Sequence, residues 1–364
     1  MGVACGIVGL PNVGKSTLFS AFTATPADRA IYPFSTTEAN VAVVNVQDDR
    51  LETIRRFIAT ERIVPAAMRV VDIPGLAAGA SKGEGMGNKF LGSVKESDAL
   101  LHVVRCFENP QVVRDGPVDP KVDMEVLELE LVMADLDTVT RNLERVSKKA
   151  KAGEKLAVFE KEVFTKAKGL LEEGRILRSA PWKPEESAAL RPLFLMTSKP
   201  MLYVANVDQD DVAGKSERAR AVAGHAVEMG AEWLPICGDI ECELVNMGPE
   251  DRGVFQQELG IAELALPRLI RKAFELLGLQ TFFTAGPKEI RAWTIQKGDT
   301  GPVAAGVIHT DFLKGYVRAE VYSVDDLVAY GSEAAIKSHG KMRVEGREYV
   351  MRDSDVAHFL VATK

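Results

Sequence analysis

The sequence contains only four cysteines, Cys5, Cys106, Cys237 and Cys242, and they show no metal-ligand spacing. Without matching His or Cys partners nearby they do not form a structural zinc site, and reduced thiols are the plain interpretation. No apolar run approaches the roughly 18 residues of a membrane helix, and the N-terminus has no basic segment ahead of an apolar one. We therefore expect a cytoplasmic protein with no membrane segment.

The chain also lacks an excess of positive charge. Its net charge is -7, which argues against a protein that coats nucleic acid by bulk electrostatics and leaves room only for a local basic surface. Its 364 residues, of which 46% are hydrophobic, can bury a large core and suffice for two or three domains. No internal repeat or low-complexity tract is visible, and we expect a monomer.

Short apolar, β-branched runs recur along the first 240 residues, with helix-like stretches between most of them. They are "ACGIVGL", "NVAVVNV", "MRVVDIPG", "ALLHVVRCF", "PMLYVANV" and "EWLPICG". This alternation predicts an α/β fold with a largely parallel sheet covered by helices.

The interval from about residue 121 to 195 has no strand-like run. Apolar residues recur there at helical spacing on either side of the turn "KAGEK": Leu129, Val132, Leu136, Val139, Leu143 and Val146, then Leu156, Phe159, Val163 and Leu170. Two such stripes predict an antiparallel helical hairpin inserted into the sheet domain. Helices packed directly on the sheet are the alternative.

After a helix that ends near Gly278, the pattern changes to strand-like alternation in "EIRAWTI", "GYVRAEVY", "GREYVMRD" and "VAHFLVA". We predict a nucleotide-binding domain over 1–120 and 196–280, a helical arm over 121–195, and a small mixed-sheet domain over 281–364.

"GLPNVGKST" follows the first predicted strand and matches G-x-x-x-x-G-K-[ST] through Gly9, Gly14, Lys15 and Ser16. In this motif backbone N–H groups hold phosphate oxygens, the lysine reaches the β- and γ-phosphates, and the hydroxyl ligates Mg²⁺. We predict that Lys15 is also catalytic. The predicted nucleotide-binding residues of the loop are Asn12, Val13, Gly14, Lys15, Ser16 and Thr17.

A second motif, "VVDIPGL", gives Asp72 and Gly75 after another apolar strand. The carboxylate can hold magnesium through water, and the N–H of Gly75 can contact a γ-phosphate. In the order P-loop, then D-x-x-G, the two motifs support each other.

Base choice depends on "ANVDQDD", where guanine-specific relatives carry Asn-Lys-x-Asp. Here Asn206 and Val207 are followed by Gln209 at the position of the guanine-reading carboxylate. The neutral side-chain amide of Gln209 cannot make charge-assisted hydrogen bonds to guanine, so adenine becomes at least as acceptable as guanine in this site. A one-residue shift would let Asp208 or Asp210 take that role instead.

These residues resemble the YchF or Obg-like ATPases, a branch of the P-loop proteins, over nearly the whole chain. The matching segments are "GLPNVGKSTLF", "YPFSTTEAN", "GLAAGASKGEGMGNKFL", "HVVRCFENP", "LYVANV" and "AAGVIHTDFLKGY". The resemblance implies a helical arm, a C-terminal ubiquitin-like (β-grasp, TGS) domain, ATP hydrolysis in preference to GTP, and association with ribosomes.

The resemblance also implies residue roles. Thr36 is similar to the switch threonine on magnesium and Asn206 to the asparagine at the base, while Cys237 and Gly238 stand in the last base-side loop. The sequence departs from the family pattern at Gln209, where a glutamate is usual, and at Pro74, where a small residue is usual.

Hydrolysis needs a group that orients water, and Leu76 stands where many GTPases carry glutamine. Three substitutes are open: a backbone or solvent arrangement, a monovalent cation such as K⁺ near Asn12, or His102, where the family pattern includes a histidine. A lone histidine in an apolar strand is more often a core residue.

We expect a ribosome-associated ATPase that uses Mg²⁺ and acts as a conformational switch. A ribosome-assembly GTPase and an ATP-binding adaptor without turnover are the alternatives. Basic residues near the arm tip, Arg141, Arg145, Lys148, Lys149, Lys151 and Lys155, and the segment with Lys314, Tyr316 and Arg318 are candidate contacts to ribosomal RNA. Solvated charge on the arm and an ordinary edge strand are the plainer alternatives.

Overall fold

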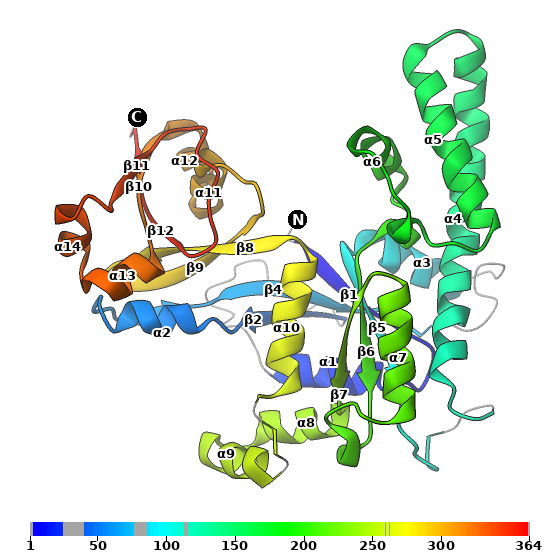
Figure 1. The fold of residues 1–364 in the computed structure, drawn as a ribbon, viewed down its shortest axis with the longest axis horizontal. Helices are drawn as coiled ribbons and strands as arrows, with labels where there is room; N and C mark the ends of the chain where they lie inside the picture. The colour runs from blue at the N-terminus through cyan, green and yellow to red at the C-terminus, as the bar shows by residue number, and fades with distance from the viewer. Residues whose placement is uncertain are drawn as a thin grey trace. The chain divides into compact units, whose positions relative to one another are not determined.

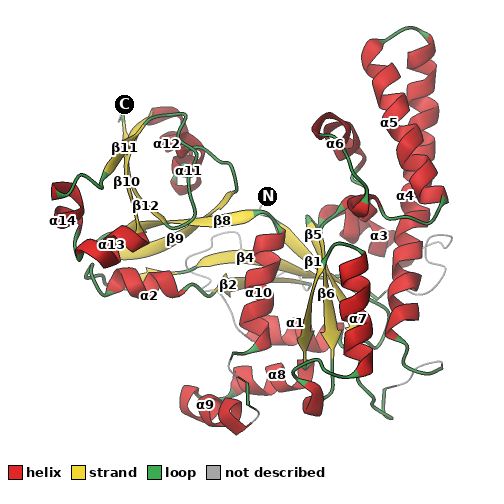
Figure 2. Cartoon of the chain, viewed as in Figure 1, coloured by secondary structure: helices red, strands yellow, loops and turns green. Residues whose placement is uncertain are grey.

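The computed structural model describes residues 3–24, 40–75, 86–112, 116–258, 260–261 and 263–362. These residues form two compact units (Figures 1 and 2). One unit contains residues 1–42 and 69–269, and the other contains residues 43–68 and 270–364. The second unit thus includes residues 43–68, which the sequence predicts within the nucleotide-binding domain.

The first sheet has the strand order β2-β4-β1-β5-β6-β7. Its strands are β1 (Ala4–Val8), β2 (Val41–Val46), β4 (Ala66–Asp72), β5 (Ala99–Arg105), β6 (Met201–Asn206) and β7 (Glu232–Ile236). The pairs of β1 with β4 and β5, of β5 with β6, and of β6 with β7 are parallel. All six predicted strands are therefore present, and the parallel arrangement is confirmed.

Helices connect these strands, as parallel pairing requires. They are α1 (Lys15–Ala24), α2 (Asp49–Arg55), α3 (Met86–Glu96), α4 (Pro120–Lys151), α5 (Lys155–Glu172), α6 (Pro184–Leu190) and α7 (Glu217–Glu228). Three further helices follow the last strand of this sheet: α8 (Gly238–Asn246), α9 (Pro249–Glu258) and α10 (Ala265–Leu276). Short 3₁₀ turns lie at Leu177–Ser179, Arg191–Leu193, Met196–Ser198 and Gln209–Asp211. Among the described helices, none has both the length and the apolar character of a membrane span.

The predicted hairpin consists of α4 and α5, which extend beyond the sheet of their unit (Figure 1). Val139, Val146, Val163 and Phe164 are buried between the two helices, and Gly153 turns the chain with φ +85°. Two members of the predicted stripes do not join this core, because Leu129 is 54% and Leu156 is 70% exposed.

The base of the hairpin is fixed by a buried acid. The carboxylate of Asp135 on α4 accepts hydrogen bonds from the N–H groups of Met196 and Thr197 at 3.0 and 2.7 Å, and from the Thr197 hydroxyl at 2.7 Å. These three donors offset only part of the cost of burying a group that is 0% exposed, because burial still raises the pKa of Asp135.

The second unit contains a mixed sheet with the order β11-β10-β12-β8-β9-β3. Its elements are β3 (Arg62–Val64), β8 (Leu279–Ala285), β9 (Glu289–Gln296), α11 (Gly301–Ile308), α12 (Thr310–Gly315), β10 (Tyr316–Ser323), α13 (Val324–Tyr330), α14 (Glu333–Ser338), β11 (Arg343–Glu345) and β12 (Asp355–Val361). The first and last strands of the C-terminal segment, β8 and β12, pair in parallel, and helix α11 packs against the core side. This arrangement is that of a β-grasp domain.

One predicted strand is wrong, because residues 346–353 form a turn and a single bridge from Val350 to Thr300. The inward residues Tyr349 and Met351 bond to neighbouring loops: Gly301 N–H donates to the Tyr349 carbonyl at 2.8 Å, and Met351 N–H donates to the Asp299 carbonyl at 2.9 Å. The alternating pattern therefore reflects burial of one side without sheet pairing. Strand β8, which lies in "LQTFFTA", was not predicted.

Candidate nucleotide-binding site

The loop Gly9–Gly14 leads directly from β1 into α1, so the N-terminus of α1 faces the space inside the loop, where it can bind an anion. At Gly9 and Gly14 the loop backbone passes so close to neighbouring atoms that a side chain would not fit. A Cβ atom added to Gly14 would lie 2.1 Å from Asn206 Nδ2, and one added to Gly9 would lie 2.5 Å from the Val103 carbonyl oxygen. Gly9 and Gly14 are thus required by close approach of the loop to other parts of the protein.

Lys15 lies at the first position of α1 and is only 7% exposed. Its ammonium group donates hydrogen bonds to the carbonyl oxygens of Gly9 and Leu10 at 3.0 and 2.7 Å. Burial lowers the pKa of Lys15 to about 8, although the Asp72 carboxylate opposes this shift. The Lys15 ammonium group therefore lies within the loop with its positive charge only partly compensated.

The D-x-x-G segment reaches the same place. A Cβ atom added to Gly75 would lie 3.1 Å from Lys15 Nζ, so Gly75 borders the lysine. Asp72 ends β4, and burial raises its pKa while the nearby Lys15 charge lowers it. The structure therefore brings together Lys15, Asp72 and Gly75.

The oxygen donors predicted for magnesium are the exposed Ser16 side chain at the start of α1 and the half-buried Asp72. Thr36, the third predicted ligand, and Leu76 lie outside the described residues. Among the described residues, no cluster of three or more His, Cys, Asp or Glu side chains could hold a metal. This donor set fits Mg²⁺, which uses one or two protein oxygens beside phosphates and water.

Asn206 joins three elements of the site. Its side-chain amide donates to the Val13 carbonyl at 3.0 Å, and its side-chain oxygen accepts from the N–H of Gly238 at 3.1 Å. The amide group is therefore engaged with the protein at both ends and 6% exposed. It braces the phosphate loop against the segment that begins α8.

Gly238 takes part in this contact through its N–H, and Cys237 precedes it at the N-cap of α8. Burial raises the pKa of the Cys237 thiol, so it is an unreactive thiol at neutral pH. The neighbouring Cys242 donates its S–H to the Thr17 carbonyl at 3.1 Å, which adds a second link between α8 and α1.

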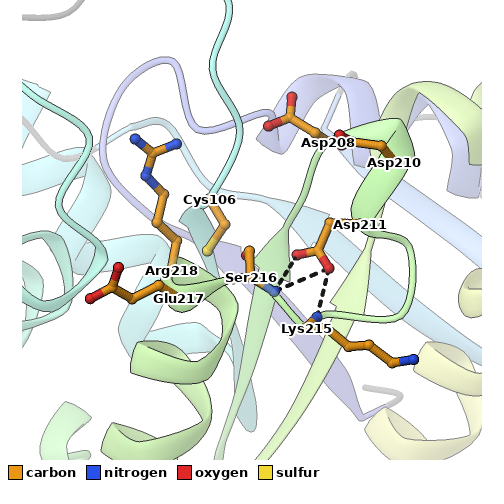
Figure 3. A pocket seen from close by; sticks show the side chains of 8 residues that line it. All are labelled: Cys106, Asp208, Asp210, Asp211, Lys215, Ser216, Glu217 and Arg218. Carbon is orange, nitrogen blue, oxygen red and sulfur yellow. Dashed lines mark hydrogen bonds between the residues drawn. The ribbon is translucent and has the colours of Figure 1, made fainter.

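After Asn206 and the buried Val207, the chain borders a cavity of about 550 Å³, which Figure 3 shows. Its lining residues are Cys106, Asp208, Asp210, Asp211, Lys215, Ser216, Glu217 and Arg218. The Asp211 carboxylate accepts from the N–H groups of Lys215 and Ser216 at 2.6 and 3.1 Å. Burial alone would raise the pKa of Asp211, but these bonds lower it.

The other acids of this segment differ in how far they are engaged. Asp208 accepts from the Glu108 N–H at 3.2 Å. Gln209 and Asp210 are exposed at the start of the short 3₁₀ turn.

His102 lies on β5 opposite Val8 of β1, and is 1% exposed. Its ring packs 5.5 Å from the Tyr203 ring, and its Nδ1 has no hydrogen-bond partner. Burial lowers the pKa of His102 to about 3. These surroundings favour the interpretation of His102 as a structural residue of the core.

Next to His102 lies a buried polar cluster that the sequence did not reveal. Glu128 of α4 accepts from the Tyr203 hydroxyl and bonds to His225 Nε2 at 3.1 Å, while Arg178 donates to the Tyr203 oxygen at 2.8 Å. The cluster ties the arm to β6 and α7. Its only signal in the sequence is an acid at a core position of α4, one turn after Met124 and just before Leu131.

The C-terminal candidate contact is only partly as predicted. Lys314 and Arg318 are exposed, but Tyr316 is 3% exposed and its hydroxyl donates to the Glu345 carbonyl at 3.2 Å. The prediction that the Tyr316 ring contacts RNA is therefore wrong, whereas contacts by Lys314 and Arg318 stay predictions. Tyr316 begins β10 with its ring in the core. A register shift between Tyr316 and Arg318 interrupts the usual alternation, so that Arg318 is exposed although it lies two residues further on.

Comparisons with known proteins cover both parts of the chain. The YchF GTPase C-terminal family model, described as a protein of unknown function, matches residues 279–362, and the 50S ribosome-binding GTPase model matches residues 4–152. The chain is 47% identical over 362 residues to the "Ribosome-binding ATPase YchF" of Haemophilus influenzae, covering 99% of both chains. The protein of the same name from Bacillus subtilis is 46% identical over 362 residues, with the same coverage.

Among solved structures, that of the Schizosaccharomyces pombe YchF GTPase matches with a TM-score of 0.89 and 34% sequence identity. The match covers 99% of this chain and 98% of the other. The similarity therefore extends over both units.

Proposed function

Because the chain belongs to the YchF family, we propose that it is a ribosome-associated P-loop ATPase that hydrolyses ATP to ADP and phosphate. In this proposal the hydrolysis cycle switches the conformation of a translation or stress regulator that acts as a monomer in the cytoplasm. The observation that carries it is the meeting of Lys15, Asp72 and Gly75 at the start of α1. Such a site holds a nucleoside triphosphate through backbone N–H groups, one lysine and one carboxylate.

Lys15 is the proposed catalytic cation. Its ammonium group exchanges the carbonyl oxygens of Gly9 and Leu10 for phosphate oxygens and stabilises the charge on the transferred group. Ser16, Thr36 and Asp72 would hold Mg²⁺, which supplies charge neutralisation when bound. K⁺ near Asn12 is a second, optional ion.

The proposed base contacts are Asn206, Val207, Gln209, Cys237 and Gly238. Asp211 accepts hydrogen bonds from two backbone N–H groups. Asp208 accepts only one and, as a carboxylate, keeps further acceptor capacity, so Gln209, Asp208 and Asp210 are the candidates at the base. The neutral Gln209 supports adenine at this position, because it makes no charge-assisted hydrogen bond that would favour guanine. The names of the relatives differ on this point, since one is called an ATPase and another a GTPase.

Calorimetric titration of the nucleotide-free protein with non-hydrolysable ATP and GTP analogues, in the same magnesium buffer, tests base choice. We expect tighter binding of the ATP analogue in the wild type and a shift toward the GTP analogue in Gln209→Asp. Asp210→Asn is the matched control, with unchanged preference. A clear preference of the wild type for GTP would assign the protein to the ribosome-assembly GTPases.

Turnover is tested separately, by multiple-turnover phosphate release with and without ribosomes. Lys15→Met should abolish release. Nucleotide binding without any turnover in the wild type would favour the adaptor alternative.

The role of His102 has its own test, in which its buried ring is replaced and nucleotide binding is measured beside turnover. Unchanged turnover in His102→Gln, with intact nucleotide binding, would remove it from the mechanism and leave a backbone-positioned or solvent-positioned water or a monovalent cation. A large loss of turnover at unchanged affinity would place it there.

A further inference from the structure

The tip of the arm concentrates positive charge on an otherwise acidic protein. Between residues 145 and 155 there are five cations and one anion, a net charge of +4, whereas the whole chain carries -7. The cations are Arg145, Lys148, Lys149, Lys151 and Lys155, and the anion is Glu154. All six are exposed, and we refer to the five cations as the tip patch.

The tip patch differs from the rest of the arm in how its charges are paired. Lower on the hairpin, Lys166 pairs with Glu186 at 3.0 Å and Lys168 pairs with Glu172. Within the described part of the chain, no ion pair engages the five cations of the tip patch. Their charges are therefore available to a partner.

Helix stabilisation explains only part of this arrangement. Lys148, Lys149 and Lys151 lie in the last turn of α4, where cations interact favourably with the helix dipole. Lys155, however, begins α5, whose first turn contains no acid and whose N-cap residue Glu154 makes no capping bond. A cation at that end opposes the dipole, so local stability does not account for it.

The patch is held on a packed scaffold. Val146 and Ala157, which lie on the two helices beside the turn, are 5% and 3% exposed, and the Asp135 carboxylate anchors the base of α4. The hairpin therefore presents the cations at a fixed spacing, which reduces the entropy lost on binding.

The residue types indicate the chemistry of the partner. Lysines are hydrated point charges that suit phosphate groups, whereas base reading uses guanidinium forks or stacking rings. From residue 141 to 158 the sequence contains no aromatic residue and only the two arginines Arg141 and Arg145. Such a surface positions a phosphate backbone without reading its sequence.

We propose that the tip patch binds the sugar-phosphate backbone of ribosomal RNA, an inference that rests on the proposed ribosome association. Contacts of this kind displace counterions, so log Kd changes linearly with log salt concentration, with about 0.7–0.9 in slope per phosphate contact. Loss of four contacts should therefore lower the slope by about 3.

The test measures the affinity of the full-length protein for purified ribosomes, and for protein-free ribosomal RNA, between low and moderate salt. The variant K148Q/K149Q/K151Q/K155Q keeps good helix formers at each position. The matched control is K288Q/K297Q/K337Q/K341Q, which removes four exposed lysines of the second unit. ATPase turnover without ribosomes and helicity should equal the wild-type values in both variants.

We expect the tip variant to bind ribosomes and RNA more weakly, with the salt slope lower by about 3, and the control to behave like the wild type. An unchanged affinity and slope would overturn the inference while leaving the proposed function intact. Weaker ribosome binding at an unchanged slope would also overturn it, because the contact would then be with ribosomal protein. A wild type without ribosome affinity would remove the proposed association itself.

Discussion

The ammonium group of Lys15 is buried against two backbone carbonyls, and its pKa is lowered to about 8. A bound triphosphate surrounds the same group with negative charge, which favours the protonated form and raises the pKa. Nucleotide binding near pH 8 should therefore take up protons, on the order of half a proton per site. The affinity should decrease as the pH rises above 8, because free enzyme must then first be protonated.

Titration of the protein with an ATP analogue at pH 8, in two buffers that differ in ionisation enthalpy, measures this uptake. Lys15→Arg is the control, since arginine stays charged and takes up no proton through this position. An apparent binding enthalpy of the wild type that is independent of the buffer would contradict the prediction.

Gly14 combines a backbone angle of +93° with a contact that excludes any side chain, since the added Cβ would meet Asn206 Nδ2. Gly14→Ala should displace the amide that braces Val13 and Gly238, and so weaken nucleotide binding by at least tenfold and lower the free energy of unfolding by about 1–3 kcal/mol. Denaturant unfolding and analogue binding check both effects.

The matched control is Gly169→Ala, because Gly169 lies within α5 with nothing within 4 Å of the added carbon. There the same change should raise the free energy of unfolding by about 0.5–1 kcal/mol. If both variants responded alike, steric exclusion at Gly14 would not be the cause.

The residues of the site differ in how predictable they are. The phosphate loop follows from local spacing, because Gly9, Gly14 and Lys15 lie within seven consecutive positions of one turn. The hydrogen bond between Asn206 and Val13 joins residues 193 positions apart, and only comparison with the sequence patterns of known nucleotide-binding proteins suggested that Asn206 lies near the nucleotide. Tyr316 was misjudged because its burial depends on which face of β10 meets α11.

At the scale of elements, helix α4 changes partner along its length. Met124, Leu127 and Leu131 pack on the sheet, whereas Val139 and Val146 pack on α5. At about 100° per residue these two faces are rotated by about 75° from each other.

Leu129 has the same helical spacing as Val132, Val139 and Val146. It lies about 170° around the helix from the face of α4 that packs on the sheet, and its side chain is exposed. Periodicity predicted the helix but could not show the change of partner.

Phe164 of α5 should dominate the stability of the arm, since it is 3% exposed within the hairpin core. Phe164→Ala should lower the free energy of unfolding of the arm by about 3–5 kcal/mol through lost burial and a cavity. Hydrogen exchange of α4 and α5 amides measures this locally.

Leu156→Ala, in the same helix at 70% exposure, is the control and should stay within about 0.5 kcal/mol of the wild type. Equal losses in the two variants would mean that Leu156 has packing contacts which its exposure does not indicate.

At the scale of the whole molecule, the chain forms two units with separate cores. One core includes Val8, Val104 and Leu131, and the other includes Phe282, Ala305 and Val321. The sequence predicted the second domain from its C-terminal strands but missed the contribution of residues 43–68. Strand β3 in that segment is only three residues long and pairs with β9, more than 220 positions away. No local sequence pattern therefore predicts this strand.

The residues proposed for nucleotide binding all belong to the first unit, so a bound nucleotide stabilises that unit directly. An ATP analogue with Mg²⁺ at 100 times its Kd should add about 2.7 kcal/mol to the free energy of unfolding. Amides of β1 and β5 should then exchange about 100-fold more slowly, while those of β8 and β12 keep their rates. Lys15→Met, which should not bind, provides the baseline for both sets. Equal slowing in all four strands would show instead that the two units unfold together, because stabilisation of one would then be shared by the other.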